Sequence, residues 1–413
     1  MQFLQRKIYS ELKSHSAQPE ISLILGPRQA GKTTLMKRLQ VDLETRGLKT
    51  AFFNLDLIEE KRFFKTQHTL LKEIRRRLGR TKDGIVFIDE IHRIENAGLF
   101  LKGFFDLQTK YKLIVSGSGA LELKADIIEP MTGRKRVFYC LPLTFTEFAA
   151  YRLKTDFKNI KKHLQLDKYE RSRLVSEYLV YGGYPRVVLA ESHSEKLEIL
   201  TEIFSSYIER DIQAILGVEK EGAFQRLVRL LAHQVGNIIN KTELSGNVGV
   251  DVRTVEKYLY LLEKTFVVSL IHPFYTNARK EARKNPKAYF MDLGLLSLAK
   301  GIQPADQLTI EGSRFENACY LRLNELKTWE GVKFWRTKAG SEVDFILNSD
   351  QGEKIPVEVK LKAKKGTAGK NVISFIQKYH SPQAFIYTQE DTGTFEKAGV
   401  PVHLLPYHQL PNL

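Results

Sequence analysis

Cysteine is scarce in this chain of 413 residues, which contains only Cys140 and Cys319. Two cysteines are too few for a disulfide framework or a cysteine-rich zinc cluster, so we predict neither. Long apolar runs are also missing: no stretch of about eighteen apolar residues occurs, which excludes a membrane-spanning helix. The first residues lack the apolar segment of a signal peptide. The sequence therefore predicts a cytoplasmic protein without a membrane partner.

Acidic residues are outnumbered by basic ones. Lysine and arginine total 64 and aspartate and glutamate 48, which gives a formal net charge of +16. Such an excess favours a polyanionic partner, most plausibly DNA or RNA, although a generic basic surface is the alternative. A chain of this length also exceeds the usual size of a single hydrophobic core, which predicts two to four domains.

An apolar run at residues 23–25 leads into a segment that matches the Walker A pattern G-x-x-x-x-G-K-[ST]. We expect Gly26 and Gly31 to adopt backbone angles that a Cβ would block, so that loop N–H groups can surround a phosphate. Lys32 can reach the β- and γ-phosphates of ATP, and the Thr33 hydroxyl suits Mg²⁺. The residues expected to bind the nucleotide are Gly26, Pro27, Arg28, Gln29, Ala30, Gly31, Lys32, Thr33 and Thr34.

A second motif follows at residues 84–90, where an apolar strand ends in Asp89 and Glu90. This is the Walker B pattern, in which Asp89 would hold Mg²⁺ and Glu90 would polarise the attacking water. A predicted strand at residues 50–55 lies between the two motif strands, and Glu directly follows Asp. Both features favour ATPases that hydrolyse through a Walker B glutamate. The alternative is a buried strand that merely ends in a solvated acidic turn.

Two further positions are candidates for catalysis. The predicted strand at residues 112–118 ends in small polar residues, and Ser116 or Ser118 could contact the γ-phosphate as a sensor. An ordinary exit from the strand is the alternative. Arg134 lies in a basic turn and could act as an arginine finger across the interface of a homo-oligomer. It could equally be a surface cation.

Five segments together resemble the AAA-type ATPases of prokaryotes that carry a conserved C-terminal region of uncharacterised type. The Gly-Gly-Tyr-Pro turn at 182–185 and a predicted helix at 207–212 are similar to that family as well. The family usually has Gln where this chain has His92, and we predict no role for this histidine. The five segments are residues 26–34, 88–91, 116–118, 132–134 and 141–148.

The region from 221 to 300 has the layout of a winged helix. Helices are predicted at 224–234, 241–246 and 251–264, followed by strands at 266–271 and 287–291. In this fold the third helix would enter the major groove of DNA, with Arg253 and Lys257 on its groove-facing side. The basic residues Arg279, Lys280, Arg283 and Lys284 would contact phosphates. Winged helices that only bind other proteins are the alternative.

The last segment carries several carboxylates in order. Glu316 lies on a predicted helix, Asp344 on a strand at 342–347, and Glu358 with Lys360 on a strand at 355–360. Such oxygen ligands suit Mg²⁺ or Mn²⁺. The order resembles the PD-(D/E)xK nuclease superfamily, without a Pro before Asp344. This resemblance implies Glu316, Asp344 and Glu358 as metal ligands and Glu358 and Lys360 as catalytic residues. Solvated surface charges are the alternative.

The sequence thus predicts an α/β protein with a P-loop AAA-type ATPase domain at 1–150 and a helical linker or lid at 151–220. A winged-helix domain at 221–300 and a restriction-endonuclease-like α/β domain at 301–413 would follow. The predicted function is an ATP-driven enzyme that acts on branched or damaged DNA in repair or recombination, with metal-dependent cleavage at its tail. The alternatives are a regulatory switch with an inert tail and the ATPase half of a toxin–antitoxin or defence system.

Overall fold

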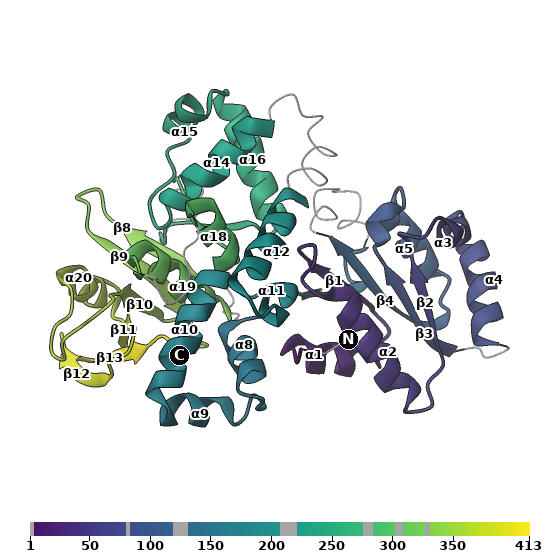
Figure 1. The fold of residues 1–413 in the computed structure, drawn as a ribbon, viewed down its shortest axis with the longest axis horizontal. Coiled ribbons are helices and arrows are strands. Elements are labelled where there is room, and N and C mark those ends of the chain that lie inside the picture. Colours follow the sequence, from purple (N-terminus) through teal and green to yellow (C-terminus); the bar gives the residue numbers. More distant parts are fainter. Residues whose placement is uncertain are drawn as a thin grey trace. The chain divides into compact units, whose positions relative to one another are not determined.

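The computed structural model describes residues 4–79, 83–118, 131–206, 221–275, 284–301, 309–326 and 331–413. The chain forms two compact units (Figure 1). The first consists mainly of Met1–Leu143, and the second contains Thr144–Ile208, Leu216–Glu263 and Val267–Leu413. In the described parts of the chain, no helix has both the length and the apolar character needed to cross a membrane.

The first unit is built on a five-stranded parallel sheet with the strand order β2-β3-β4-β1-β5. Its strands are β1 (Ile21–Gly26), β2 (Thr50–Asn54), β3 (Asp83–Asp89), β4 (Lys110–Ser118) and β5 (Lys135–Tyr139). Its helices are α1 (Ile8–His15), α2 (Lys32–Glu44), α3 (Ile58–Lys61), α4 (Gln67–Leu78) and α5 (Ala97–Asp106), with short 3₁₀ turns at Arg62–Phe64 and Ile91–Arg93.

Both faces of this sheet are buried, which explains why its strands read as continuous apolar runs. Successive residues of a strand point to opposite faces, so neighbours belong to different cores. Leu23 and Leu25 of β1 pack in one apolar cluster, whereas Ile24 between them packs in the other together with Leu35 of α2. Because the strands are parallel, the carboxyl ends of β1, β3 and β4 all meet at one edge.

The second unit combines a helical part with two sheets. Its helices are α8 (Phe145–Arg152), α9 (Ile160–Leu166), α10 (Lys168–Tyr181), α11 (Pro185–Leu189), α12 (His193–Ser206), α14 (Glu221–His233), α15 (Lys241–Val248), α16 (Val252–Lys264), α18 (Leu293–Lys300), α19 (Gly312–Asn324) and α20 (Lys370–Tyr379). Its strands are β6 (Val268–Ile271), β7 (Lys287–Phe290), β8 (Lys333–Arg336), β9 (Glu342–Asn348), β10 (Lys354–Val359), β11 (Ala384–Thr388), β12 (Gly393–Lys397) and β13 (Val400–Pro406).

The second unit begins at α8, whose first turn is closed by a capping box. The Thr144 hydroxyl accepts from the Glu147 amide, and the Glu147 carboxylate accepts from the Thr144 amide. Residues 144–150 therefore lie in the second compact unit.

The predicted bend after residue 181 is present between α10 and α11. Gly182 has a φ of 69°, and a Cβ there would lie 2.4 Å from the carboxylate oxygens of Asp292. That carboxylate accepts hydrogen bonds from the amides of Gly183 (2.8 Å) and Leu295 (3.0 Å). The bend and the first turn of α18 are thus held by one buried side chain.

The three helices and two strands expected between 221 and 300 are observed as α14, α15, α16, β6 and β7. Asp251 caps α16 as predicted, since its carboxylate accepts from the Thr254 amide at 2.9 Å. The strands β6 and β7 pair in antiparallel fashion. Residues 277–283 of the predicted basic wing and the predicted helix at 207–212 lie outside the described residues.

The second sheet of this unit has the strand order β12-β13-β11-β10-β9-β8 (Figure 1). The strands β10, β11 and β13 run parallel, and β8, β9 and β12 run antiparallel to their neighbours. The helix α20 packs on one face through Val372, Phe375 and Ile376. Adjacent strands β9 and β10 bring the C-terminal carboxylates into one region.

Candidate functional site

The Walker A segment forms the connection between β1 and α2, at the carboxyl edge of the parallel sheet. The strand ends at Gly26 and the helix starts at Lys32, as the motif requires. Gly31 precedes the helix with a φ of 94°, a value that residues with a Cβ rarely adopt. The first backbone N–H groups of α2 lack helical partners and so favour an anion.

Gly26 is required for a reason that differs from the sequence-based one. Its φ is not in the left-handed region, so the expectation about its backbone angles is wrong. Instead, a Cβ at this position would lie 2.0 Å from the carbonyl oxygen of Cys140. The Cys140 amide donates to the Leu25 carbonyl at 2.7 Å, which draws the two segments together. Glycine therefore permits a close approach of two backbones.

Two buried cations hold the loop. Lys32 is 5% exposed, and its Nζ donates to the carbonyls of Gly26 (3.0 Å) and Pro27 (2.8 Å). Burial lowers the pKa of Lys32, while the carboxylates of Glu90 and Asp89 oppose this effect. Arg6 donates from Nη1 to the Ala30 carbonyl at 3.0 Å. Arg6 is not among the residues predicted from the sequence, because nothing in the pattern around it distinguishes this arginine from the other basic residues.

The Walker B carboxylate Asp89 lies against the start of α2. Thr33 donates from Oγ1 to Asp89 Oδ2 at 2.6 Å, and Ser116 donates to Asp89 Oδ1. Burial raises the pKa of Asp89, and the hydrogen bonds from Ser116 and Thr33 oppose the rise. Ser116 also accepts from the Glu90 amide at 3.1 Å. The structure therefore joins the two motifs, and it ties Ser116 to Walker B.

Glu90 has a left-handed backbone with φ 59° and ψ 46°, which turns its side chain out of the line of β3. His92 Nδ1 lies 3.0 Å from Glu90 Oε2, and both side chains are mostly buried. Burial would raise the pKa of Glu90, but His92, Lys32 and Arg28 outweigh it and lower the pKa to about 2. His92, for which we predict no role from the sequence, is thus the neighbour of the candidate base.

Ser118 and Arg134 have different positions in the sheet. Ser118 pairs with Gly26 at the carboxyl edge, and no group in the described part of the chain bonds to its buried hydroxyl. Arg134 directly precedes β5, and its backbone carbonyl accepts a hydrogen bond from the Ile21 amide at the opposite edge of the sheet, where β1 begins. Its guanidinium pairs with Asp106 at 3.0 Å. Ser118 is therefore beside the P-loop, whereas Arg134 is far from the P-loop of its own chain.

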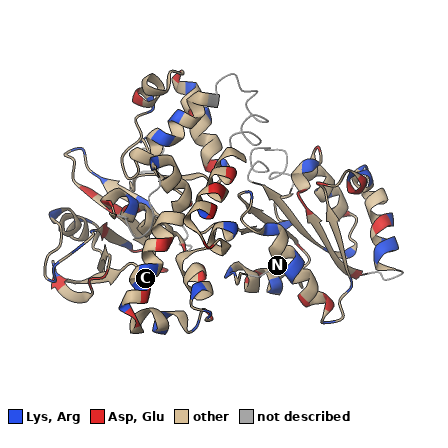
Figure 2. Ribbon diagram, viewed as in Figure 1, with Lys and Arg blue, Asp and Glu red and all other residues tan. Residues whose placement is uncertain are grey.

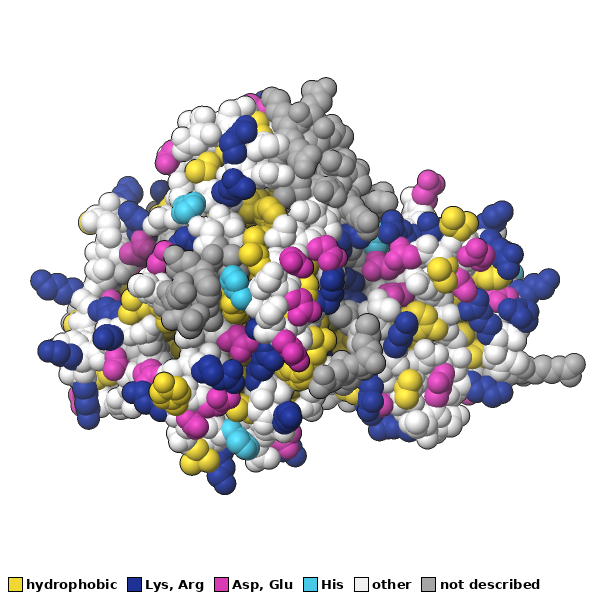
Figure 3. All heavy atoms as spheres, in the orientation of Figure 1, with side chains coloured by type: hydrophobic (Ala, Val, Ile, Leu, Met, Phe, Trp, Pro, Cys, Tyr) yellow, Lys and Arg dark blue, Asp and Glu magenta, His cyan; other side chains and the backbone are white. Residues whose placement is uncertain are grey.

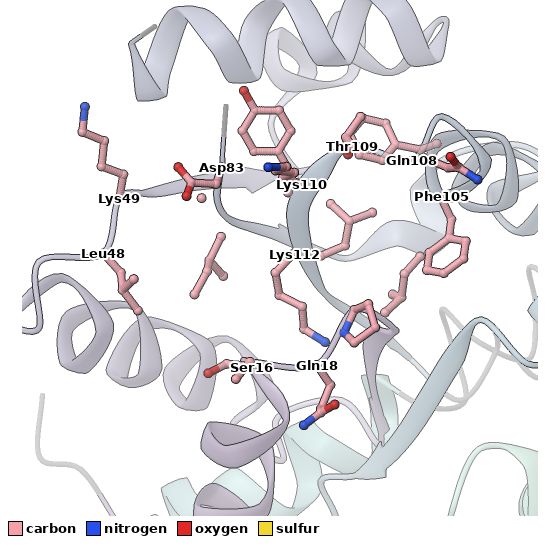
Figure 4. Close-up of a pocket in the computed structure, with 18 of the residues that line it drawn as sticks. Ser16, Gln18, Leu48, Lys49, Asp83, Phe105, Gln108, Thr109, Lys110 and Lys112 are labelled. Carbon is pink, nitrogen blue, oxygen red and sulfur yellow. The ribbon is translucent and has the colours of Figure 1, made fainter. Parts of the chain in front are cut away.

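A pocket of about 840 Å³ lies at that opposite edge (Figure 4). It is lined by the starts of β1, β3 and β4 and contains no residue of the P-loop. Lys112 extends from β4 toward the loop of Ser16 and Gln18, and its Nζ bonds to the Glu20 carbonyl. Burial lowers the pKa of Lys112 to about 8, against the effect of Glu20. The pocket is therefore separate from the candidate nucleotide site.

The C-terminal carboxylates gather where β9, β10 and α19 meet. Phe345 pairs with Val357, so the neighbouring Asp344 and Glu358 lie side by side as predicted. Burial, followed by the charge of Glu316, raises the pKa of Asp344 to about 7. Lys360 follows the end of β10, and its Nζ lies 3.1 Å from Glu358 Oε1. The structure brings these four predicted residues into one region.

Their oxygens, however, are engaged by protein donors. Asp344 Oδ2 accepts from the Val359 amide at 2.7 Å, and Glu358 Oε2 accepts from the Gly369 amide at 3.3 Å. Glu316 Oε1 accepts from the Tyr289 hydroxyl at 2.5 Å. Throughout the described ranges, no group of three or more His, Cys, Asp or Glu side chains is arranged to hold a metal ion. One oxygen of each carboxylate is thus bonded within the protein, and the described residues contain no preformed ligand group for Mg²⁺ or Mn²⁺.

On the face that Figures 2 and 3 draw, the described basic residues are mixed with acidic ones. Figure 2 shows lysine and arginine distributed among acidic residues along the helices of both units. On the face drawn in Figure 3, dark blue and magenta side chains are interspersed. Within α16, Arg253 and Lys257 are exposed, while Val255, Leu259 and Leu262 are buried as predicted. The amphipathic pattern of α16 leaves both cations accessible.

This geometry defines a P-loop ATPase site, and comparison with known proteins agrees. Residues 18–149 match the AAA domain family. Residues 18–149 therefore form an AAA-type ATPase domain. Residues 172–306 and 311–409 match two families described as domains of unknown function, DUF8612 and DUF4143.

Three relatives that are named only as uncharacterized proteins match about four fifths of this chain. A protein of Haemophilus influenzae is 26% identical over 335 residues, which cover 79% of each chain. A protein of Mycobacterium tuberculosis is 25% identical over 334 residues, which cover 79% of this chain and 67% of that protein. One of Methanocaldococcus jannaschii is 22% identical over 344 residues, or 82% and 74% of the two chains.

Solved structures match at low TM-scores. The replication initiator DnaA bound to AMPPCP and single-stranded DNA is 14% identical, with a TM-score of 0.28, and covers 63% of this chain and 90% of that one. Cdc6p from Pyrobaculum aerophilum is 12% identical, with a TM-score of 0.29, and covers 72% and 96%. At these TM-scores the superpositions carry no argument about this chain.

Proposed function

We propose that this chain hydrolyses ATP and uses the nucleotide to control its binding to DNA. The observation that carries the first half is the hydrogen bond between Thr33 and Asp89, with Lys32 and Glu90 beside it. This arrangement joins a phosphate-binding loop to a carboxylate pair at one sheet edge. Such a pair can hold a metal ion with one member and polarise water with the other.

Each residue of the site has a proposed role. The N–H groups of residues 26–34 bind the phosphates, and Lys32 exchanges its carbonyl acceptors for phosphate oxygens. Glu90, whose pKa is held low, accepts a proton from the attacking water. Ser118 donates its buried hydroxyl to the γ-phosphate. Thr33 and Asp89 are oxygen ligands that suit Mg²⁺, which when bound neutralises charge on the β- and γ-phosphates.

DNA is the proposed partner of the second unit. The net charge of +16 favours a polyanion, and the order of α14, α15, α16, β6 and β7 is that of a winged helix. We assign DNA contact to the exposed cations Arg253 and Lys257 of α16. Binding to a partner protein is the alternative for this module. A homo-oligomer is also proposed, in which Arg134 reaches the nucleotide of a neighbouring copy.

Metal-dependent cleavage by a nuclease-like C-terminal domain stays a prediction from the sequence. We do not propose it, because the carboxylates expected to bind a metal are bonded to protein donors. Of the predicted functions, the ATP-dependent switch with an inactive tail is the one these contacts favour. Action on branched DNA, a part in repair or recombination, and a toxin–antitoxin or defence role likewise stay predictions.

The test is ATP turnover in the presence of duplex, single-stranded and four-way DNA. We expect DNA to stimulate hydrolysis, and we expect Lys32→Ala and Glu90→Gln to abolish it. A variant that hydrolyses ATP at the normal rate would overturn the site assignment. Turnover that none of the three DNA substrates changes, relative to turnover without DNA, would instead remove DNA as the partner and favour a switch that acts on proteins.

A further inference from the structure

Lys287 lies in an unusual place for a lysine. It is the first residue of β7, and it is 1% exposed, the value of a core side chain. Lysine is almost never fully buried without a partner, because removing an ammonium group from water costs several kcal/mol or more. A buried lysine therefore requires negative charge close to its Nζ atom.

That charge comes from the C-terminal carboxylates. Lys287 Nζ lies 2.5 Å from Glu342 Oε1 of β9 and 3.6 Å from Glu316 Oε1 of α19. The ammonium also lies 5.2 Å from the centre of the Phe334 ring on β8. The strands β8 and β9 and the helix α19 thus surround the ammonium group of Lys287, which belongs to the two-stranded sheet of β6 and β7.

Neighbouring groups hold the carboxylates of Glu316 and Glu342 in place beside this ammonium group. Arg336 Nη1 binds the other oxygen of Glu342 at 3.0 Å. The Tyr289 hydroxyl holds Glu316 Oε1, and a Cβ on Gly236 would lie 2.9 Å from the Glu316 oxygens. The backbone is tied across the same junction, since the Phe274 amide donates to the Phe334 carbonyl at 2.5 Å. The lysine is therefore part of a fixed arrangement.

We infer that Lys287 is the internal counter-ion of the C-terminal carboxylate cluster and takes the place that a divalent cation holds in a metal-dependent nuclease. Glu316 was expected as a metal ligand, yet it faces an ammonium group that belongs to the chain itself. Two cations at one cluster repel each other, so Mg²⁺ or Mn²⁺ gains little by binding there. The lysine also joins β6 and β7 to the second sheet, where it stabilises their contact.

The first experiment measures Mn²⁺ binding to the full chain by isothermal titration calorimetry, in an Asp89→Asn background that silences the P-loop. We expect no saturable binding of Mn²⁺. Saturable binding that disappears in Asp344→Asn would overturn it. Turnover of ATP plays no part in this measurement, so the inference and the proposed ATPase activity fail separately.

The second experiment is a double-mutant cycle of thermal unfolding with Lys287→Met, Glu342→Gln and the double variant. Removing the lysine takes the ammonium away from two partly buried carboxylates, so Lys287→Met should lower the Tm by roughly 10 °C. The double variant should lose less than the sum of the two single losses. Lys284→Met, on an exposed lysine of the same segment, is the matched control and should change little. Additive losses at Lys287 and Glu342 would overturn the role of counter-ion.

Discussion

Glu90 and His92 show how one side chain can position another in the candidate active site. His92 Nδ1 lies 3.0 Å from Glu90 Oε2 as an ion-pair contact without hydrogen-bond geometry, and this contact restricts where the base lies before ATP binds. A base that is held in one geometry loses less freedom in the transition state. We therefore infer that His92 acts through Glu90 as a positioning residue.

The prediction at this scale concerns the rate of hydrolysis. We expect His92→Ala to lower kcat for ATP by about tenfold with little change in KM, since a freed base is positioned less often. His92→Gln, the residue usual in the family that this chain resembles, keeps a donor and should retain most of the rate. His68→Ala, on the exposed side of α4, is the control. An unchanged or higher kcat in His92→Ala would contradict the positioning role.

At the scale of elements, Asp292 links the end of α10 to the start of α18. Its carboxylate is buried, and burial raises its pKa to about 6 even though three backbone amides oppose the rise. The ordinary value of 3.8 applies in the unfolded chain. Between these two values, the folded protein holds a proton that the unfolded chain has released.

The stability contributed by this carboxyl group is therefore complete below its ordinary pKa and is lost as the pH rises through about 6. A difference of about two pKa units corresponds to about 3 kcal/mol. We expect the free energy of unfolding, measured in urea, to fall over this pH range by more in the wild type than in Asp292→Asn, because the asparagine cannot ionise. Equal pH dependence of the two proteins would refute the assignment.

The helix α16 gives a second prediction at this scale. If Arg253 and Lys257 contact phosphates, replacing both with Ala should weaken binding and reduce the slope of log K against log salt by about 2. The loss should be similar for unrelated DNA sequences, because phosphate contacts carry no sequence information. Arg229→Ala, an exposed cation of α14, is the matched control. A loss of the same size in the control would argue against α16 as the DNA-binding element.

At the scale of the whole molecule, one copy does not suffice for catalysis if Arg134 acts as an arginine finger. It precedes β5 beside Ile21, and β1 spans roughly 17 Å from there to the P-loop. An arginine at that edge can reach a nucleotide only in another copy. Arg134→Ala and Lys32→Ala should each be inactive alone, and mixing them should restore part of the turnover. Full activity of Arg134→Ala by itself would exclude this role.

Much of the first unit could be predicted from the sequence. The P-loop, the Walker B strand and the intervening strand are local patterns, and each is observed within a few residues of its predicted range. The capping of α16 by Asp251 and its buried face were also readable, because caps and helical periodicity depend on neighbours in the sequence. The need for glycine at position 26 was predicted for the wrong reason. The close approach of the Cys140 carbonyl, which is distant in sequence, leaves no room for a Cβ at this position.

The sequence by itself determined which residues can meet phosphate: a glycine loop, a lysine and two adjacent carboxylates form one motif at one strand edge in any parallel sheet of this kind. Only the tertiary structure decided that Arg6 supports the loop and that Lys287 lies between Glu316 and Glu342. The reason is physical. Local periodicity fixes which face a side chain occupies, but packing between distant segments fixes which charge it meets, and no short pattern encodes that partner.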